Sequence, residues 1–250
     1  MEVKYARVLP MRKRSPAALG VFAFLFAVLA VGGMLCPIHN TLSKATMIVG
    51  WFGLLITLIE LAWRRRFLRL GFVLILVAMV LVFVLPGRRW DRQAIRARYA
   101  DYLRSYEGVR YVWGGEGRLG IDCSGLPRRA YRDALLAEGL VTFNGTLTRL
   151  WLDQWWNDAG AKAMGEGTEG RLIPLARQDP AHSDERLEPG DVAIINANTH
   201  SVVYLGDGRW IEADPGAGRV LIHDVRTEGR SFLGVSPRVF RWRELVDEKT

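Results

Sequence analysis

Three long apolar runs occupy the first third of the chain, at residues 17–36, 45–63 and 67–86. The first contains no charged residue, and the other two contain one each. At a rise of about 1.5 Å per residue, each run is long enough to cross a hydrocarbon core about 30 Å thick. The pattern predicts a membrane domain over residues 1–86 with three transmembrane helices.

Beyond residue 86 the apolar positions form shorter, amphipathic segments. Apolar side chains at helical spacing predict a helix over 91–106, and Asp122 is placed to cap a second helix that ends near Gly139. A third helix is expected over 147–164, and the polar, proline-bearing stretch 176–188 is expected to be a loop. The first half of this region is therefore predicted to be largely helical.

The spacing of apolar residues changes to that of strands after Asp191. Short apolar runs separated by turn residues predict strands at 192–196, 200–205, 209–213 and 220–225, and an apolar segment at 239–245 closes the chain. Helices followed by consecutive strands indicate an α+β fold with an antiparallel sheet. Residues 87–250 have the length of one domain with its own core.

Charge is divided unevenly between the two regions. The net charge of +8 comes entirely from residues 1–86, which hold ten Lys/Arg and two Asp/Glu, whereas residues 87–250 hold 24 of each sign. A neutral domain offers no basic face to phosphates, so nucleic acid is not expected as a partner. The basic residues instead flank the apolar runs, as in an integral membrane protein.

The basic residues also predict the orientation of the spans. Five Lys/Arg precede the first span and three arginines at 64–66 link the second to the third, whereas the loop 37–44 holds only Lys44. Five arginines just after the third span oppose this bias, namely Arg88, Arg89, Arg92, Arg96 and Arg98. By the positive-inside rule the tail and the link lie in the cytoplasm, and residues 87–250 lie on the other side of the membrane.

The chain contains two cysteines, Cys36 and Cys123. Cys36 ends the first apolar run and is interpreted as an ordinary membrane residue. Cys123 then has no intrachain partner in the second region, which excludes a disulfide framework and a cysteine-based zinc site. No metal or organic cofactor is expected.

Cys123 occupies a position suited to a nucleophile, in the stretch GIDCSGL at 120–126. At the start of a helix, unpaired backbone N–H groups and the positive end of the helix dipole favour thiolate over thiol. The small neighbours Ser124 and Gly125 leave room for a substrate carbonyl, and the backbone N–H groups there are suited to an oxyanion. A buried structural cysteine is the alternative interpretation.

A cysteine nucleophile needs a base, and His200, at the start of a predicted strand, is the candidate. If residues 206–208 form a three-residue hairpin loop, His200 faces Asp214 and lies on the same side of the sheet as Glu212. A two-residue loop would place His200 and Glu212 on opposite faces. Either carboxylate is suited to orient the imidazole, and strand pairing alone leaves the choice open.

Four motifs follow one another in the second region: YVWGG at 111–115, GIDCSGL at 120–126, LEPGDVAII at 187–195 and HSVVYLGDGRWIEA at 200–213. Together they resemble the NlpC/P60 family, over residues of about 91–250. The resemblance implies a papain-like α+β fold and a cysteine peptidase or amidase whose usual substrate is the peptide stem of bacterial peptidoglycan. The expected location is the bacterial inner membrane, with the hydrolase domain on the extracytoplasmic side.

Position by position, the resemblance implies that Cys123 is the nucleophile, His200 the general base and Glu212 the orienting third residue of a Cys–His–acid relay. Tyr111 matches an aromatic residue near the oxyanion site. Ser124 is grouped with it as an oxyanion- or substrate-binding residue, and Asp214 remains the alternative to Glu212.

The sequence departs from the family pattern at several positions. The third residue is more often His, Asn or Gln than Glu, Ser201 stands where an apolar residue is expected, and Pro127 where a β-branched residue is common. The segment 141–188 is longer and richer in tryptophan than a minimal family member. The glutamate leaves the orienting role open between two acids, and the long segment leaves the substrate open.

These features favour a membrane-anchored cysteine peptidase that cleaves amide bonds in peptidoglycan stem peptides. One alternative keeps the relay and changes the substrate, as a thiol acyltransferase or amidase acting on lipid. Another is a catalytically silent membrane module that binds wall peptides, and the intact Cys123 and His200 argue against it.

Overall fold

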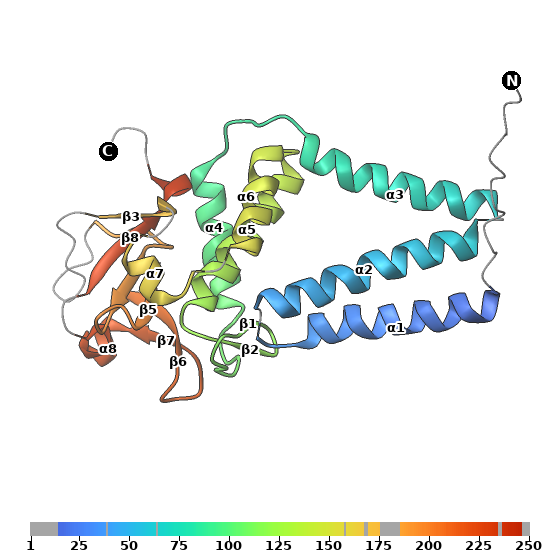
Figure 1. Ribbon diagram of the computed structural model, residues 1–250. Coiled ribbons are helices and arrows are strands. Elements are labelled where there is room, and N and C mark those ends of the chain that lie inside the picture. The colour runs from blue at the N-terminus through green and yellow to red at the C-terminus, as the bar shows by residue number, and fades with distance from the viewer. Residues whose placement is uncertain are drawn as a thin grey trace, which may run out of the picture. The chain divides into compact units, whose positions relative to one another are not determined.

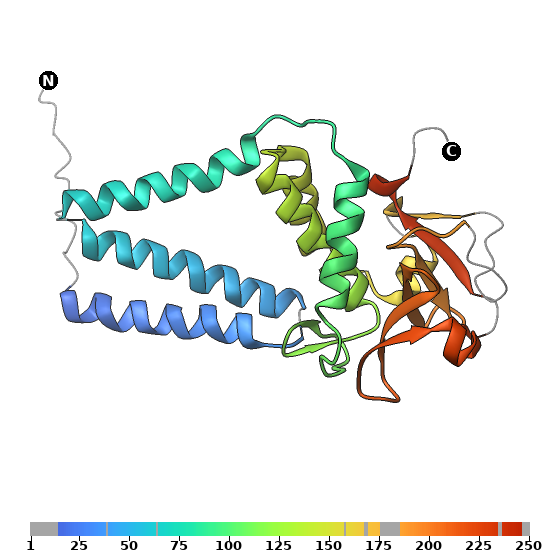
Figure 2. The same ribbon diagram turned by 180° about the vertical axis from the view of Figure 1, so that it is seen from behind.

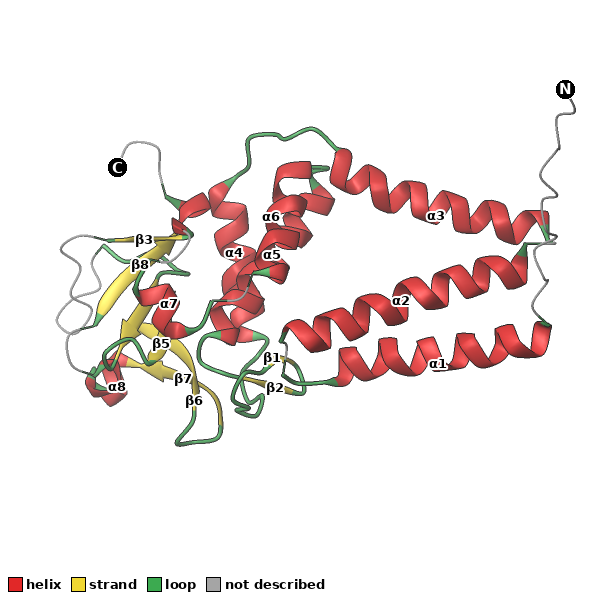
Figure 3. Cartoon of the chain, viewed as in Figure 1, coloured by secondary structure: helices red, strands yellow, loops and turns green. Residues whose placement is uncertain are grey.

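The computed structural model describes residues 15–38, 40–63, 65–157, 159–167, 170–175, 186–234 and 237–246. The basic tail 1–14 and most of the predicted loop 176–188 lie outside these ranges. The chain divides into two compact units, one formed by Met1–Leu35 and Thr41–Ile75, the other by Cys36–Asn40 and Leu76–Thr250. The described strands all belong to the second unit (Figure 3).

The first unit consists of long apolar helices (Figure 1). Helices α1 (Pro16–Leu35) and α2 (Thr41–Ala62) pack against each other, and α3 (Arg66–Val84) begins in this unit. All three are long and apolar enough to cross a membrane. Most of their large apolar side chains are exposed, and no described residue of α3 is buried. Such surfaces suit a hydrocarbon environment.

Helices α1 and α2 approach each other closely at Gly50. A Cβ atom at this position would lie 2.3 Å from the backbone nitrogen of Ala30, so only glycine fits. Small residues of this kind let helix backbones come together in a bilayer, where packing rather than the hydrophobic effect holds helices in contact.

The second unit places helices against an antiparallel sheet (Figures 1 and 2). Its helices are α4 (Arg92–Arg104), α5 (Gly125–Val141), α6 (Gly145–Trp156), α7 (Ala161–Gly165) and the short α8 (Val225–Glu228). The main sheet has the order β3-β8-β4-β5-β6-β7, and its strands are β3 (Leu172–Pro174), β4 (Val192–Ile195), β5 (His200–Gly206), β6 (Arg209–Asp214), β7 (Arg219–Asp224) and β8 (Arg238–Trp242). Strands β1 (Glu116–Gly117) and β2 (Gly120–Ile121) form a separate small hairpin before α5.

Most elements agree with the sequence prediction, including α4, α5 and the strands β4 to β7. The single helix predicted over 147–164 is wrong, because the chain forms α6 and α7 with a break between them. Asn157 ends α6 in an extended conformation, and Gly160 precedes α7. Both residue types are poor helix formers, and the apolar spacing that continued across them concealed the break. Strand β3 was not predicted.

Each face of the sheet is covered by its own apolar cluster, because side chains alternate along each strand. The larger cluster joins one face to α4, α5 and α6, with Tyr99, Leu135 and Leu147 among its buried residues. The smaller cluster lies on the other face, around Trp210 and Tyr204. The start of α5 is therefore pressed against the sheet on the larger core.

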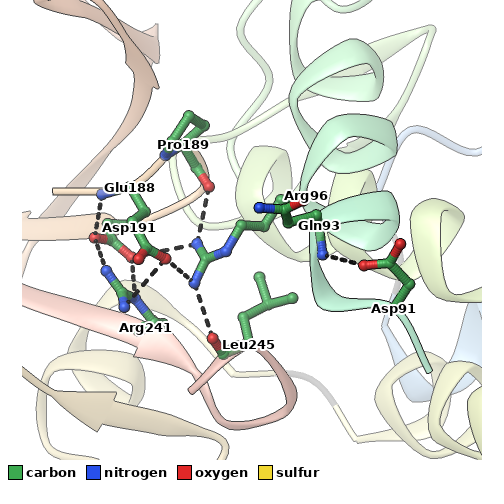
Figure 4. A network of polar contacts seen from close by, with 8 residues as sticks. All are labelled: Asp91, Gln93, Arg96, Glu188, Pro189, Asp191, Arg241 and Leu245. Atoms are coloured by element: carbon green, nitrogen blue, oxygen red, sulfur yellow. Dashed lines mark hydrogen bonds and ion pairs between the residues drawn. The ribbon is translucent and has the colours of Figure 1, made fainter. Parts of the chain in front are cut away.

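A buried ionic network ties α4 to the loop before β4 (Figure 4). Asp191 is completely buried and receives two hydrogen bonds from Arg241, at 2.7 and 2.8 Å. Arg96 of α4 pairs with Glu188 and donates to the backbone oxygens of Pro189 (3.1 Å) and Leu245 (2.8 Å). The aspartate of the LEPGD motif is thus a structural residue, in a fork geometry that suits a buried pair.

Replacing Asp191 with alanine is expected to destabilise the protein by about 3 kcal/mol, because the buried Arg241 guanidinium loses both hydrogen bonds to Asp191 and keeps only its pair with Glu188 at 3.2 Å. Asp101→Ala is the matched control, since it removes an exposed Asp–Arg pair and is expected to cost less than about 1 kcal/mol. Urea titration of the full chain in detergent micelles, followed by tryptophan fluorescence, measures both. Equal stability of the two variants would contradict the structural role of Asp191.

Candidate active site

The loop that precedes α5 is closed by the side chain of Asp122. Its carboxylate accepts hydrogen bonds from the backbone N–H groups of Gly125 (2.5 Å) and Gly114 (2.8 Å) and from the hydroxyl of Ser124 (3.0 Å). The N-cap residue of α5 is Ser124, whose side chain makes no capping bond, and it is Asp122, two residues earlier, that satisfies one of the N–H groups left unpaired at the helix start. Cys123 is held between these residues and is 6% exposed.

The sulfur of Cys123 lies among polar groups from distant parts of the chain. Sγ lies 3.9 Å from the backbone oxygen of Thr199, and Cys123 lines one cavity together with His200 and Tyr111. The fold therefore brings together Cys123, His200 and Tyr111, three residues that the sequence motifs single out.

The ring of His200 is held on its far side by Glu212. His200 Nε2 contacts Glu212 Oε2, and both side chains are largely buried. The carboxylate of Asp214 accepts instead the backbone N–H of Gly216 in the following turn, at 2.7 Å. Of the two acids left open by strand pairing, Glu212 is the one that meets the imidazole.

An irregular hairpin between β5 and β6 makes this contact possible. The turn is two residues long, not three as expected, and consists of Asp207 and Gly208, both with positive φ. A regular two-residue hairpin would put His200 and Glu212 on opposite faces of the sheet. A shift of register within 204–206 adds one residue to β5 and returns both side chains to the same face.

The groups behind Glu212 were not identified from the sequence. His223 Nε2 lies 2.7 Å from Glu212 Oε1, and His223 Nδ1 lies 2.6 Å from Glu228 Oε2. The His223 ring also stacks on Phe232, with 4.5 Å between centroids. The signal available in the sequence was the strand period, since His223 and Glu212 share a face of neighbouring strands. Glu212 is therefore shared between two imidazoles.

Burial and hydrogen bonding act in opposite directions on the pKa of His200. Burial lowers the pKa, because it disfavours the charged ring, but hydrogen bonds to Cys123 and Glu212 outweigh it and raise the pKa to about 9. The imidazolium is thus the favoured form at neutral pH, beside a sulfur that a positive charge activates. Burial and the nearby Cys123 and Asp122 raise the pKa of Tyr111 to about 12, so its hydroxyl remains a donor.

These groups line an open cavity of about 480 Å³. Cys123, His200 and Glu212 form part of its wall, together with Trp113 of the YVWGG motif, which is 78% exposed. A second cavity, of about 580 Å³, is larger but lies beside α4 and the loop at 188–189 and contains no nucleophile. Chemistry and not size identifies the first cavity as the candidate site.

Ser124 and the tryptophans of α6, which the sequence analysis singled out, do not line this cavity. The hydroxyl of Ser124 is used inside the turn by Asp122, which leaves only its backbone for an oxyanion. The tryptophans of α6 do not line the cavity either: Trp151 stacks on Phe83, with 6.5 Å between centroids, and Trp156 faces outward. Trp113 is the tryptophan that the site uses.

Ser201 joins the sheet to the nucleophile loop. It is 1% exposed, and its hydroxyl donates to the backbone oxygen of Cys123 at 2.5 Å. A buried hydroxyl needs such a partner, so the departure from an apolar residue at this position is matched by a hydrogen bond. Because His200 is the preceding residue of β5, this bond also helps to fix the spacing between the sulfur and the imidazole.

The fold and the site define an α+β protein of the papain-like class, with a cysteine at the start of a helix and a histidine on the adjoining sheet. The NlpC/P60 family model matches residues 108–232, half of the chain, and the chain belongs to this family. The predicted family and fold class are thereby confirmed.

Individual relatives match over part of their length. The chain is 25% identical over 130 residues to murein DD-endopeptidase MepS/murein LD-carboxypeptidase of Escherichia coli K12, covering 51% of this chain and 54% of that protein. It is 26% identical over 136 residues to dipeptidyl-peptidase 6 of Lysinibacillus sphaericus, covering 54% and 39%. The solved peptidoglycan hydrolase RipB of Mycobacterium tuberculosis aligns with a TM-score of 0.36 and 23% identity, over 62% of this chain and 67% of that one. The chain thus spans about half the length of the first of these relatives.

Alkylation of Cys123 tests the thiolate–imidazolium pair. In a Cys36→Ser background Cys123 is the sole cysteine, and iodoacetamide is expected to modify it at pH 7 about ten-fold faster than in the His200→Ala variant, because the imidazolium favours the thiolate. Since the pKa of His200 is raised to about 9, the advantage should persist from neutral pH up to about pH 9 and decline above it.

Glu212→Gln is expected to slow the alkylation of Cys123 toward the rate of the His200→Ala variant, since it removes a carboxylate that keeps the ring charged. Asp214→Asn is the matched control and should leave the alkylation rate within about two-fold, because the Asp214 carboxylate accepts the N–H of Gly216 in the following turn and does not contact the ring. Equally slow alkylation of the parent and of His200→Ala would show that no such pair exists.

Proposed function

We propose that this protein is a membrane-anchored cysteine hydrolase that cleaves amide bonds in the peptide stems of peptidoglycan. The observation that carries the proposal is the convergence of Cys123, His200 and Glu212 on one open cavity. A thiol beside an imidazole that a carboxylate orients is the arrangement that thiol hydrolases use for acyl transfer.

The proposed reaction has two steps. The thiolate of Cys123 attacks the amide carbon while the imidazolium of His200 gives its proton to the leaving amine, which yields a thioester and the free amine. His200 then takes a proton from water, whose oxygen attacks the thioester carbon, and Cys123 departs as thiolate from the carboxylic acid. Glu212 keeps the ring in place, and the hydroxyl of Tyr111 is available to donate to the oxyanion.

The substrate class is supported by the relatives and by the shape of the site. The names of two relatives refer to peptidase activity, and one of them names murein as its substrate. The cavity is open and has Trp113 and Asp214 in its wall, which suits a short peptide that enters from solvent and carries polar groups.

We further propose that α1, α2 and α3 cross the bacterial inner membrane and that the hydrolase lies on its extracytoplasmic side. The length and composition of the helices support the crossing. The basic residues support the sidedness, and so does the loop between α1 and α2: Ile38 forms a β-bridge with Gly115, and the N–H of Glu116 donates to the backbone oxygen of Pro37 at 3.1 Å. This loop and the YVWGG loop belong to one compact unit, as they must if both lie on the same side of the membrane.

Digestion of purified peptidoglycan sacculi by the full chain in detergent micelles tests the activity. The wild type is expected to release peptide-bearing fragments that mass spectrometry identifies, and Cys123→Ala is expected to release none, because no other described thiol lines the cavity. Cys36→Ser is the matched control and should retain activity. If the wild type leaves sacculi intact and instead releases fatty acid from phospholipid vesicles, the substrate is lipid and the proposal is wrong.

Labelling of single cysteines from outside the membrane tests the orientation. With both native cysteines replaced by serine, a cysteine at the exposed position Asp207 should react with a membrane-impermeant maleimide added to intact spheroplasts. A cysteine at Arg65, in the short link before α3, should react only after lysis. The reverse pattern would place the hydrolase in the cytoplasm.

A further inference from the structure

The hairpin of α5, its connecting turn and α6 exposes a group of large apolar side chains. These residues, called the hairpin patch below, are between 45% and 64% exposed: Leu140, Val141 and Phe143. Apolar groups gathered in this way on a protein surface mark an interaction site. Phe143 has a φ of +51°, a conformation that costs energy for an aromatic residue, so the turn is strained where it presents this ring.

The turn of the hairpin is hydrogen-bonded to the chain just beyond α3. The buried amide of Asn144 accepts from the backbone N–H of Arg88 at 3.2 Å and donates to the backbone oxygen of Arg88 at 2.8 Å. The N–H of Gly145 donates to the backbone oxygen of Pro86 at 3.2 Å. A Cβ atom at Gly145 would lie 1.9 Å from the oxygen of Leu85, so the two segments touch along their backbones.

The first turn of α6 also caps the end of α3. The hydroxyl of Thr148 donates to the backbone oxygen of Val82 at 3.1 Å, and Arg149 Nη1 donates to the oxygens of Phe83 (2.8 Å) and Leu85 (3.1 Å). The last carbonyls of a helix have no partner within the helix, and in an apolar setting they need donors. These residues all belong to the second unit, so the hairpin and the last turn of α3 form one joint.

We propose that the hairpin patch is seated in the boundary between lipid headgroups and acyl chains, at the extracytoplasmic end of α3. The inference rests on the proposed function in one respect, namely that α3 crosses the membrane. Helix α3 has 19 residues and is therefore about 28 Å long, so it fills the hydrocarbon core and ends at its edge near Val84. The patch adjoins the turn that is hydrogen-bonded to this end of α3, so we place the patch at the same depth in the bilayer.

The composition of the joint fits this occupant. Phe143 is an aromatic side chain, and aromatic side chains are enriched at membrane interfaces. Arg88 and Arg89 follow α3 directly and are exposed, where they are suited to lipid phosphates. A lipid boundary therefore satisfies both the apolar patch and the basic residues beside it.

Helix α5 connects the patch to the loop that holds Cys123. Helix α5 carries the patch at its last residues and begins two residues after Cys123, and its 17 residues span about 25 Å. The nucleophile and the lipid contact thus lie at opposite ends of one helix.

Spin-label depth measurements on the full chain test the proposal. In a Cys36→Ser, Cys123→Ser background, single nitroxides are placed at Val141 and Phe143, whose exposure makes both positions tolerant of labels. Reference labels stand at Val77 in α3 and at Asp207 in the β5–β6 turn. The chain is reconstituted into vesicles of phosphatidylcholine and phosphatidylglycerol in equal parts, and the accessibility of each label to oxygen and to a water-soluble nickel chelate is compared.

Labels at 141 and 143 are expected to show an oxygen-to-nickel accessibility ratio about three-fold or more above that at 207, and below that at 77. If 77 is deep but 141 and 143 match 207, the span stands and the patch lies in water, which overturns the inference. If labels at 141 and 143 are shielded from both reagents, a protein covers the patch, which also overturns it. If 77 itself is accessible to nickel, the proposed anchoring fails, and the inference fails with it.

Discussion

The seam between the start of α5 and the start of β5 is the contact on which the rest of the site depends. There the buried hydroxyl of Ser201 donates to the backbone oxygen of Cys123, while Asp122 closes the loop in front of the helix. Because His200 and Ser201 are neighbours, the hydrogen bond that joins the sheet to the loop also holds the imidazole beside the sulfur. A buried hydroxyl left without its partner costs about 1–3 kcal/mol, so breaking the contact between Ser201 and Cys123 is unfavourable.

Behind this seam, acids and bases alternate from His200 through Glu212 and His223 to Glu228. A carboxylate at the third position holds a positive charge on the ring more strongly than the neutral groups that the resemblance leads one to expect there. His223 gives that carboxylate a second partner, so Glu212 is buried with both oxygens engaged. The pKa of His223 is raised, because its hydrogen bond to Glu228 and the charge of Glu212 outweigh burial, which acts first to lower it. The unusual glutamate therefore belongs to a chain of groups that compensate one another, and its burial is tolerable for that reason.

Helix α5 connects the loop that holds Cys123 to the last residues of α3. One end of α5 carries the loop of the nucleophile, and its other end turns into α6 against the last residues of α3. The buried Asp191 network holds α4 to the sheet beside it, so the helical layer has a fixed relation to the strands.

Much of this organisation follows from the sequence alone, because it rests on local patterns. Uncharged runs specify candidate spans, the period of apolar residues specifies α4, α5 and the strands, and the motif around Cys123 together with His200 identifies the two groups that must meet. What needed the tertiary structure were features set by single residues in contact with distant ones. The register shift within 204–206 returns Glu212 and Asp214 to the face of His200, and sequence period cannot reveal it, because one inserted residue reverses every face beyond it. The choice of Glu212 over Asp214 is seen only in the side-chain contacts that each acid makes. The roles of His223 and Ser201 emerge for the same reason: a hydrogen bond across strands or between sheet and helix depends on positions in space, which local spacing along the chain does not determine.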